Sequence, residues 1–295
     1  MASSQKSKKI ISPKKSGLDS KKLIKQYSGQ LPSEELDILL ALALHKKVEY
    51  IYKNSPLKIS TSATKKFVKL VRQRRAGWSI AYLRGYKEFF GYKFLINKHT
   101  LIPRPESEII VEQTLAYLKK YKLKNPHIID IGTGSGCLIL SVAKNYSQAD
   151  YTATDISIHA LQIARTNARK LGLKKQIKFY KSNLLKKINT SASSVQKFDI
   201  ILANLPYLKL EQMKEASIKK EPRVALLAGA DGLSYYRKLL EQIPPHLNKK
   251  YLILLEIDPS QKDLIAKNIK ANLPKAKIKF LKDLAGHFRI AQITD

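Results

Sequence analysis

A short apolar segment that runs directly into three alternating glycines constrains the fold of this chain more than any other feature. Residues 127–131 (HIIDI) have the composition of a buried strand, Gly132, Gly134 and Gly136 follow at once, and residues 138–144 have a helical pattern. Glycines let the backbone approach a ligand closely and leave amide N–H groups free at a helix start. The Gly-x-Gly-x-Gly spacing is not the Gly-x-Gly-x-x-Gly of dinucleotide sites, so it favours a different nucleoside cofactor. A plain tight turn is the alternative.

Strand and helix patterns alternate from residue 125 to the end of the chain. We expect helices between most of the seven strands, which lie near residues 127–131, 150–154, 176–181, 198–203, 250–256, 276–281 and 287–293. Such alternation is typical of an α/β fold with a doubly wound, mostly parallel seven-stranded sheet. The last two strands leave no room for a helical crossover, so we expect the final strand to be antiparallel to its neighbours.

The preceding residues divide into three expected segments. Residues 1–22 are rich in Ser and Lys and indicate a disordered basic tail, with a mitochondrial transit peptide as the alternative. Residues 23–85 predict a small helical substrate-recognition domain, with helices from Ser33 and from Ser62 or Thr64 to Ala76, and a further turn at 78–82. Residues 86–105 predict a hairpin that turns near Gly91 and a stiff proline-rich connector. Residues 106–295 would then form the main domain, starting with a helix that ends near residue 120.

Composition limits the partners and the compartment. The chain carries 55 Lys and Arg against 23 Asp and Glu, a net charge of +32. This predicts salt-sensitive attraction to polyanions, such as a weak contact with nucleic acid or the ribosome, although a general enrichment in Lys explains the charge equally well. A single cysteine, Cys137, excludes an intrachain disulfide, and no apolar run approaches the ~18 residues of a membrane span. We therefore expect a cytoplasmic protein with no membrane contact; the six histidines show no metal-ligand spacing, so we expect no metal site.

Two acids and the cysteine surround the glycine segment. Asp155 ends the second strand, where a carboxylate can accept hydrogen bonds from both hydroxyls of a ribose; capping of the helix that follows is the alternative. Asp130 could orient the glycine loop or face an amino group of the cofactor, and a purely structural role stays open. Cys137 has no histidine close in sequence to act as its base, so we interpret it as a small buried apolar residue.

The strand at 198–203 ends in Asn204-Leu205-Pro206-Tyr207, which is suited to holding a planar NH2 group. Nitrogen in such a group is a poor nucleophile. An enzyme that methylates it must therefore hold its hydrogens in acceptors and direct the nitrogen at the methyl carbon of the donor. The Asn204 side-chain oxygen can accept one hydrogen, the Leu205 carbonyl can accept the other because Pro206 favours an extended Leu205, and Tyr207 can pack on the planar group. We predict Asn204, Pro206 and Tyr207 as catalytic residues. An ordinary strand ending with a capping Asn is the alternative.

With these motifs the chain resembles the peptide-chain-release-factor glutamine methyltransferases, over about residues 34–260. The resemblance lies in residues 82–91 (YLRGYKEFFG), 101–108 (LIPRPESE), 130–137 (DIGTGSGC), 221–223 (EPR) and 230–233 (ADGL). It implies a class I methyltransferase that uses S-adenosylmethionine to methylate the Gln of a Gly-Gly-Gln loop in release factors. It also implies the sites: Gly132, Thr133, Gly134, Ser135, Gly136, Asp155, Asn183, Leu184 and Asn204 for the cofactor, and Asn204, Leu205, Pro206, Tyr207, Arg104 and Glu106 for the substrate.

Two positions depart from the family pattern. The family has Asn-Pro-Pro-Tyr where this chain has Leu205, which leaves the backbone φ less fixed. It also has an aromatic residue after Asp near the adenine, where this chain has Asn183 and Leu184, so stacking is lost. Asn-Leu-Pro-Tyr is the form found in ribosomal-RNA adenine dimethyltransferases, so methylation of an RNA or DNA adenine amine is the alternative activity. A non-catalytic RNA- or ribosome-binding protein is a third hypothesis.

Overall fold

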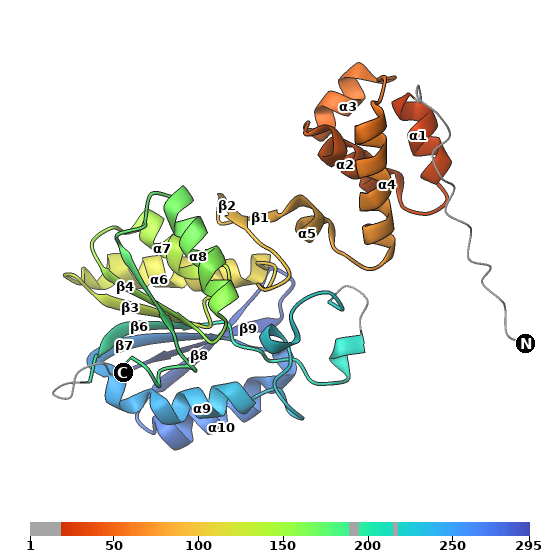
Figure 1. Ribbon diagram of the computed structural model, residues 1–295. Helices are drawn as coiled ribbons and strands as arrows, with labels where there is room; N and C mark the ends of the chain where they lie inside the picture. The colour runs from red at the N-terminus through yellow and green to blue at the C-terminus, as the bar shows by residue number, and fades with distance from the viewer. Residues whose placement is uncertain (1–18, 189–194, 215–217) are drawn as a thin grey trace, which may run out of the picture. The chain divides into compact units, whose positions relative to one another are not determined.

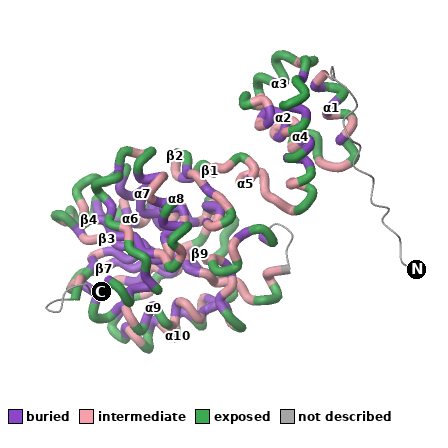
Figure 2. The backbone as a smooth tube through the Cα atoms, in the orientation of Figure 1, coloured by how far each residue is buried: buried purple, intermediate pink, exposed green. Residues whose placement is uncertain are grey.

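The computed structural model describes residues 19–188, 195–214 and 218–295 and divides the chain into two compact units, Met1–Arg84 and Gly85–Asp295. Figure 1 shows the helices and strands of both units, and Figure 2 shows which residues each unit buries. In the part of the chain that is described, no helix is long and apolar enough to cross a membrane.

The first unit is helical and has its own apolar core. Its helices are α1 (Ser20–Tyr27), α2 (Ser33–Leu44), α3 (Val48–Asn54), α4 (Thr61–Arg75) and α5 (Ile80–Arg84). Leu23, Leu39 and Phe67 are fully buried where α1, α2 and α4 pack together. Arg74 of α4 donates two hydrogen bonds of 2.8 Å to the carboxylate of Glu35 in α2, and this paired contact fixes how the two helices meet.

Three sequence expectations for this unit need correction. The basic tail was expected to reach residue 22, but α1 begins at Ser20, because the Asp19 side chain caps it by accepting from the Lys22 N–H. Residues 1–18 lie outside the described residues. Ser33 is the first residue of α2 and not its cap. Helix α4 begins earlier than expected, at Thr61, since Ser60 is its N-cap.

The second unit is a seven-stranded sheet preceded by a hairpin. The hairpin consists of β1 (Tyr86–Phe89) and β2 (Tyr92–Leu95), with Phe90 and Gly91 at positive φ in the turn. The sheet strands are β3 (His127–Ile131), β4 (Asp150–Asp155), β5 (Ile177–Lys181), β6 (Phe198–Ala203), β7 (Leu247–Glu256), β8 (Lys277–Lys282) and β9 (Phe288–Thr294). Their spatial order is β5-β4-β3-β6-β7-β9-β8, and only β9 is antiparallel to its neighbours. This confirms the expected doubly wound sheet and its antiparallel last strand.

Helices cover both faces of the sheet (Figure 1). Helices α6 (Glu108–Tyr121), α7 (Cys137–Asn145) and α8 (Ile158–Lys170) lie on one face, and α9 (Ser234–Gln242) and α10 (Lys262–Asn272) lie on the other. Alternate residues of each central strand enter opposite cores: Ile129 packs in the core under α9 and α10, while Ile128 packs in the core under α6 and α7. Strands buried on both faces explain the near-continuous apolar runs in the sequence.

The chain reverses direction across the sheet between β3 and β6. From β3 the chain proceeds to β4 and β5 on one side, and from β6 to β7 on the other. The carboxyl ends of β3 and β6 therefore have no crossover helix between them, which is where ligands bind in open α/β sheets. Both sequence motifs lie there, because the glycine segment follows β3 and Asn204 follows β6.

Candidate active site

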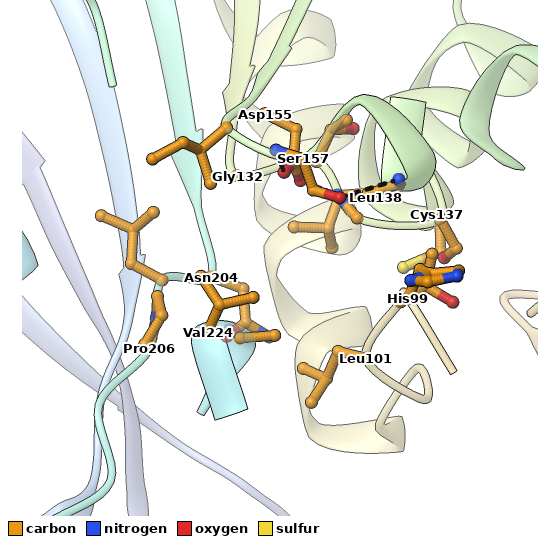
Figure 3. Close-up of a pocket in the computed structure, with 18 of the residues that line it drawn as sticks. His99, Leu101, Gly132, Cys137, Leu138, Asp155, Ser157, Asn204, Pro206 and Val224 are labelled. Carbon is orange, nitrogen blue, oxygen red and sulfur yellow. Dashed lines mark hydrogen bonds between the residues drawn. The ribbon is translucent and has the colours of Figure 1, made fainter. Parts of the chain in front are cut away.

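A cleft with an empty volume of about 980 Å³, partly open to solvent, lies at this point. Figure 3 shows the cleft with Gly132, Asp155, Asn204 and Pro206 around it. Its walls bring together most of the expected residues, namely Arg104, Gly132, Thr133, Gly134, Ser135, Asp155, Asn183, Leu184, Asn204, Leu205 and Pro206. Tyr207 lines a smaller adjoining pocket, which it shares with Asn204 and Arg104. Glu106 lines neither pocket.

The glycine loop leaves room for a ligand on its cleft side. Gly132, Gly134 and Gly136 all have positive φ, the region that favours glycine. A Cβ on Gly132 would lie 2.9 Å from the Leu205 side chain, whereas one on Gly134 would meet only a single atom, at 4.0 Å. The turn at Gly132 is therefore fixed by packing, while Gly134 faces open space that a cofactor could occupy.

Asp155 is held in place by the loops on either side. Its carboxylate accepts the Gly134 N–H at 2.9 Å and the Ser157 N–H at 2.8 Å. Burial raises the pKa of Asp155, and these backbone donors partly offset that effect. The N-cap of α8 is Ser157, whose hydroxyl accepts from Ala160, so capping does not occupy Asp155. A carboxylate with spare lone pairs at this position fits a ribose.

Asp130 is completely buried beneath the glycine loop. Its Oδ2 accepts a hydrogen bond of 2.6 Å from the Thr133 hydroxyl, while Oδ1 has no partner among the described residues. Burial raises the pKa of Asp130 to about 7. Asp130 thus orients the loop through Thr133, and its other oxygen is buried and does not line the cleft.

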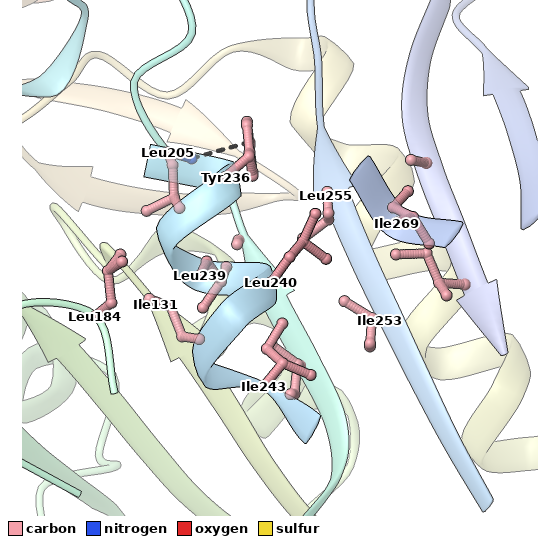
Figure 4. Packing of buried hydrophobic residues seen from close by; sticks show 14 of the residues in the cluster. Ile131, Leu184, Leu205, Tyr236, Leu239, Leu240, Ile243, Ile253, Leu255 and Ile269 are labelled. Atoms are coloured by element: carbon pink, nitrogen blue, oxygen red, sulfur yellow. Dashed lines mark hydrogen bonds between the residues drawn. The ribbon is translucent and has the colours of Figure 1, made fainter. Parts of the chain in front are cut away.

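Cys137 begins α7 at the end of the loop. Burial raises the pKa of its thiol to about 12, so the group stays protonated and is a poor nucleophile. The unreactive thiol agrees with the interpretation of Cys137 as a non-nucleophile, but the residue is partly exposed in the cleft wall and not buried as expected. Asn183 and Leu184 also line the cleft, and Leu184 has a φ of +56° and packs in the same core as Leu205 (Figure 4).

The amide of Asn204 has a defined set of partners. Its NH2 group donates to the Ser107 hydroxyl at 3.0 Å and to Glu256 Oε2 at 2.8 Å. Its Oδ1 has no partner among the described residues, so the oxygen is the part of the amide that remains available to the cleft. Pattern analysis of the sequence did not identify Ser107 or Glu256, although an acid that ends an apolar strand was a usable signal.

Leu205 is fixed even though it replaces a proline. Its N–H donates to the Tyr236 hydroxyl at 3.2 Å (Figure 4), a bond that proline could not make. Its side chain is 4% exposed and packs against Gly132. The expected loosening at this position is therefore offset by a hydrogen bond and by packing.

Tyr207 and the connector are held by residues that are distant in the sequence. The Tyr207 carbonyl accepts from the Gln261 side chain at 2.8 Å, and a Cβ on Gly232 would overlap both of these groups. Arg104 forms an ion pair with the buried Glu221, whose other oxygen accepts the Ile102 N–H at 3.2 Å. The segments 221–223 and 230–233 thus support the cleft from outside it.

One further residue that the pattern analysis missed connects the glycine loop to the hairpin. Asn167 of α8 donates to the Ser135 carbonyl at 2.9 Å and exchanges hydrogen bonds with the backbone of Leu95. A single buried Asn on the apolar face of a helix was the only signal for it.

Three features meet at the switch point of the seven-stranded sheet, namely the glycine loop, the acid suited to a ribose and the amide at a strand end. Together they define a class I methyltransferase. Residues 122–284 match the family model described as "Methyltransferase domain". A release factor glutamine methyltransferase of Borreliella burgdorferi is 38% identical over 233 residues, which are 78% of either chain. This protein belongs to the release factor glutamine methyltransferase family.

Two other similarities concern part of a relative and the fold. The bifunctional methyltransferase of Rickettsia bellii is 32% identical over 262 residues, which are 80% of this chain and 46% of that protein, so this chain spans about half of that relative. The crystal structure of the hMettl16 catalytic domain in complex with MAT2A 3'UTR hairpin 6 has a TM-score of 0.53 at 19% identity. The match covers 70% of this chain and 76% of the hMettl16 chain, and it supports the fold alone.

Proposed function

We propose that this protein transfers a methyl group from S-adenosylmethionine to the side-chain amide nitrogen of the Gln in the Gly-Gly-Gln loop of peptide chain release factors. The observation that carries the proposal is the Asn204 amide: its NH2 group is bound within the protein, and its oxygen remains available to the cleft beside the glycine loop. The family to which the chain belongs supports the same substrate.

The cleft residues fit this cofactor in a simple arrangement. The open space beside Gly134 would hold part of the molecule, Asp155 would accept the ribose hydroxyls, and Asp130 would act from beneath the loop by holding Thr133. Asn183 and Leu184 would line the adenine end. S-adenosylmethionine, when bound, supplies an electrophilic methyl group on a sulfonium.

The substrate amide would be held on the Asn204 side. Asn204 Oδ1 and the Leu205 carbonyl would accept the two hydrogens of its NH2 group. Pro206 and Tyr207 would pack against the flat amide and restrict the orientation of its plane. Once the nitrogen has gained the methyl group it is cationic and acidic, so a proton leaves without a strong base. Arg104 lines both pockets and would contact the substrate backbone. A substrate role of Glu106 stays a prediction, since its side chain lies outside both pockets.

The test is transfer of radioactive methyl from S-adenosylmethionine to a purified release factor, with mass spectrometry of the labelled peptide. We expect label on the Gln of the Gly-Gly-Gln loop and none on its Gln→Ala version. Asn204→Ala should lower kcat about 100-fold, the scale expected when a reacting group loses its alignment. Asn248→Ala is the matched control, because Asn248 pairs with Asp199 at the other end of the sheet.

Methylation of an RNA or DNA adenine amine is the competing outcome of this test. It is motivated by Leu205 in place of proline and by the net charge of +32. Label in RNA that survives protease would favour this activity over the proposed function, provided that the release factor and its Gln→Ala version do not differ in labelling. Tight cofactor binding without any transfer would favour a binding protein.

We also propose a weak, salt-sensitive contact with nucleic acid at the β5 edge of the sheet. The sequence has no Asp or Glu between Asp155 and Asp199, and α8 and β5 lie in this interval. A groove there contains Arg165, Arg169 and Lys174 beside Phe179. Lys174→Glu should weaken the retention of a short RNA duplex at low salt, whereas Lys279→Glu on the opposite edge should change it less. Equal effects of both variants would indicate diffuse charge.

A further inference from the structure

Glu256 is a buried carboxyl group that contacts residues of the active site. It ends β7, directly beyond the pairing of Leu255 with Ala203 of β6, so it lies beside Asn204. Glu256 is 2% exposed, and burial raises the pKa of its carboxyl. A buried carboxylate is costly unless hydrogen bonds compensate it. Here three side chains donate to it, and all three come from the segments that form the cleft.

The three donors connect Glu256 to the reactive segment and to the connector. Glu256 Oε2 accepts from the Ser107 hydroxyl and, at 2.8 Å, from the Asn204 NH2 group, and Oε1 accepts from the Tyr207 hydroxyl at 3.2 Å. Ser107 also accepts from the Asn204 NH2 group at 3.0 Å, so Asn204, Ser107 and Glu256 form a closed triangle.

Glu256 reaches Leu205 through its backbone. Its carbonyl accepts from the Tyr236 hydroxyl, and that hydroxyl accepts the Leu205 N–H at 3.2 Å (Figure 4). A single residue therefore supports Asn204 and Tyr207 through its side chain, and Leu205 through Tyr236. Only Pro206 of the four-residue segment lacks this support.

The carboxylate determines which end of the Asn204 amide faces the substrate. The two ends of a carboxamide have nearly the same shape, so packing alone does not distinguish them. Three hydrogen-bond donors around Glu256 oppose the effect of burial and favour its ionised form, and an ionised carboxylate can only accept hydrogen bonds. With the amide reversed, Asn204 Oδ1 would take the place of the nitrogen that now lies 2.8 Å from Glu256 Oε2, and two acceptors at that separation would repel. The NH2 group must therefore face inward and the oxygen outward.

We propose that Glu256, with Ser107, is a positioning residue that locks the Asn204 amide with its oxygen toward the substrate nitrogen. The proposal rests on the proposed function, because an outward oxygen matters only when the substrate group is a hydrogen-bond donor. Reversal of the amide would present an NH2 group to the substrate NH2 group, and the substrate could not be held.

The first test needs no activity. In the full-length protein without ligand, the side-chain NH2 resonance of Asn204, assigned by its loss in Asn204→Ala, should be shifted downfield and protected from solvent exchange. Glu256→Gln should remove much of that shift, because a Gln side chain has one acceptor for three donors and a donor of its own. An unchanged Asn204 signal in Glu256→Gln would overturn the lock.

The second test separates positioning from a purely structural role. We expect Glu256→Gln to lower kcat on the release factor about 100-fold, with a nearly unchanged KM for S-adenosylmethionine and a melting temperature that falls but stays well above the assay temperature. Ser107→Ala should lower kcat, and Ser107→Thr, which keeps the hydroxyl, should restore most of it. Asp199→Asn is the matched control, since that carboxylate also accepts two hydrogen bonds but lies at the start of β6.

The outcomes separate the two proposals. If the wild-type protein labels no release factor while the Asn204 resonance responds to Glu256→Gln, the proposed function fails and the lock stands as a structural fact. If transfer occurs but Glu256→Gln melts early and loses kcat and cofactor binding together, Glu256 is a folding residue and the positioning role is wrong.

Discussion

Replacement of Gly232 by alanine tests how the cleft depends on residues outside it. Gly232 has a φ of +75°, and its added Cβ would overlap the Tyr207 carbonyl oxygen and the Gln261 amide nitrogen. Two costs follow. An L-residue in the left-handed region costs roughly 1–2 kcal/mol. Moving Gln261 also breaks its hydrogen bonds to the Tyr207 and Asp231 carbonyls, each of which contributes about 0.5–1.5 kcal/mol.

Gly172→Ala is a matched control for the backbone cost. Gly172 has the same φ of +75°, but its added Cβ would have no atom within 4 Å. We expect Gly172→Ala to lose about 1–2 kcal/mol and to keep full activity. Gly232→Ala should lose about 2–5 kcal/mol, and its kcat should fall because the displaced Tyr207 carbonyl moves the reactive segment.

The assay combines chemical unfolding with initial rates of methyl transfer for the wild type and both variants. The informative quantity is the difference in unfolding free energy between Gly232→Ala and Gly172→Ala, because the backbone cost cancels. A difference near zero, together with an unchanged kcat in Gly232→Ala, would show that the 230–233 segment does not hold Tyr207 in place.

Three further predictions concern buried polar groups. Asp155→Asn should weaken the binding of S-adenosylhomocysteine, measured by calorimetry, about 10- to 100-fold. An amide cannot accept both the Gly134 and Ser157 N–H groups and also a ribose hydroxyl. The control Asp150→Asn, at the exposed start of the same strand, should have no effect. Asp130 has a folded pKa of about 7, above the 3.8 of an unperturbed Asp, so the folded state binds the extra proton and wild-type stability should fall as pH rises between these values. Asp130→Asn does not titrate and lacks this loss, so its unfolding free energy relative to the wild type should rise by on the order of 2 kcal/mol from pH 5 to pH 8. A difference between the two proteins that does not change with pH would contradict the raised pKa of Asp130. Tyr236→Phe should cost about 1–3 kcal/mol in unfolding free energy, because the Leu205 N–H and the Glu256 carbonyl both lose a buried partner; a cost like that of Tyr235→Phe would refute it.

Much of the fold was predictable because its signals are local. Single elements are specified by the apolar runs of β3 and β6, by the glycines after β3 and by the short link between β8 and β9. The right-handed crossover rule then places the ends of β3 and β6 side by side. The position of Gly134 and Asn204 on one cleft follows from that topology alone. The error at the start of α4 arose because several capping residues stand close together there, as at Ser60 and Ser62, whereas α2 begins after Pro32, which has no side-chain cap.

The support of the site was not predictable in the same way. Asn204 meets Ser107 across 97 positions of sequence and Glu256 across 52. No periodicity relates residues so far apart, and a Glu at a strand end is also compatible with solvent exposure. Glu106 shows another limit of pattern reasoning: its neighbours Arg104 and Ser107 line the cleft while Glu106, in the 3-10 turn at 105–107, lines neither pocket, so its substrate role stays a prediction.

The most direct test of the central claim is a crystal structure of this protein with S-adenosylhomocysteine. We expect the ribose hydroxyls at Asp155, the sulfur facing Asn204, and the Asn204 NH2 group still bound to Ser107 and Glu256, so that the amide oxygen lies toward the position of the transferred methyl group. A sulfur far from Asn204, or an Asn204 oxygen turned away from it into the protein interior, would contradict the account.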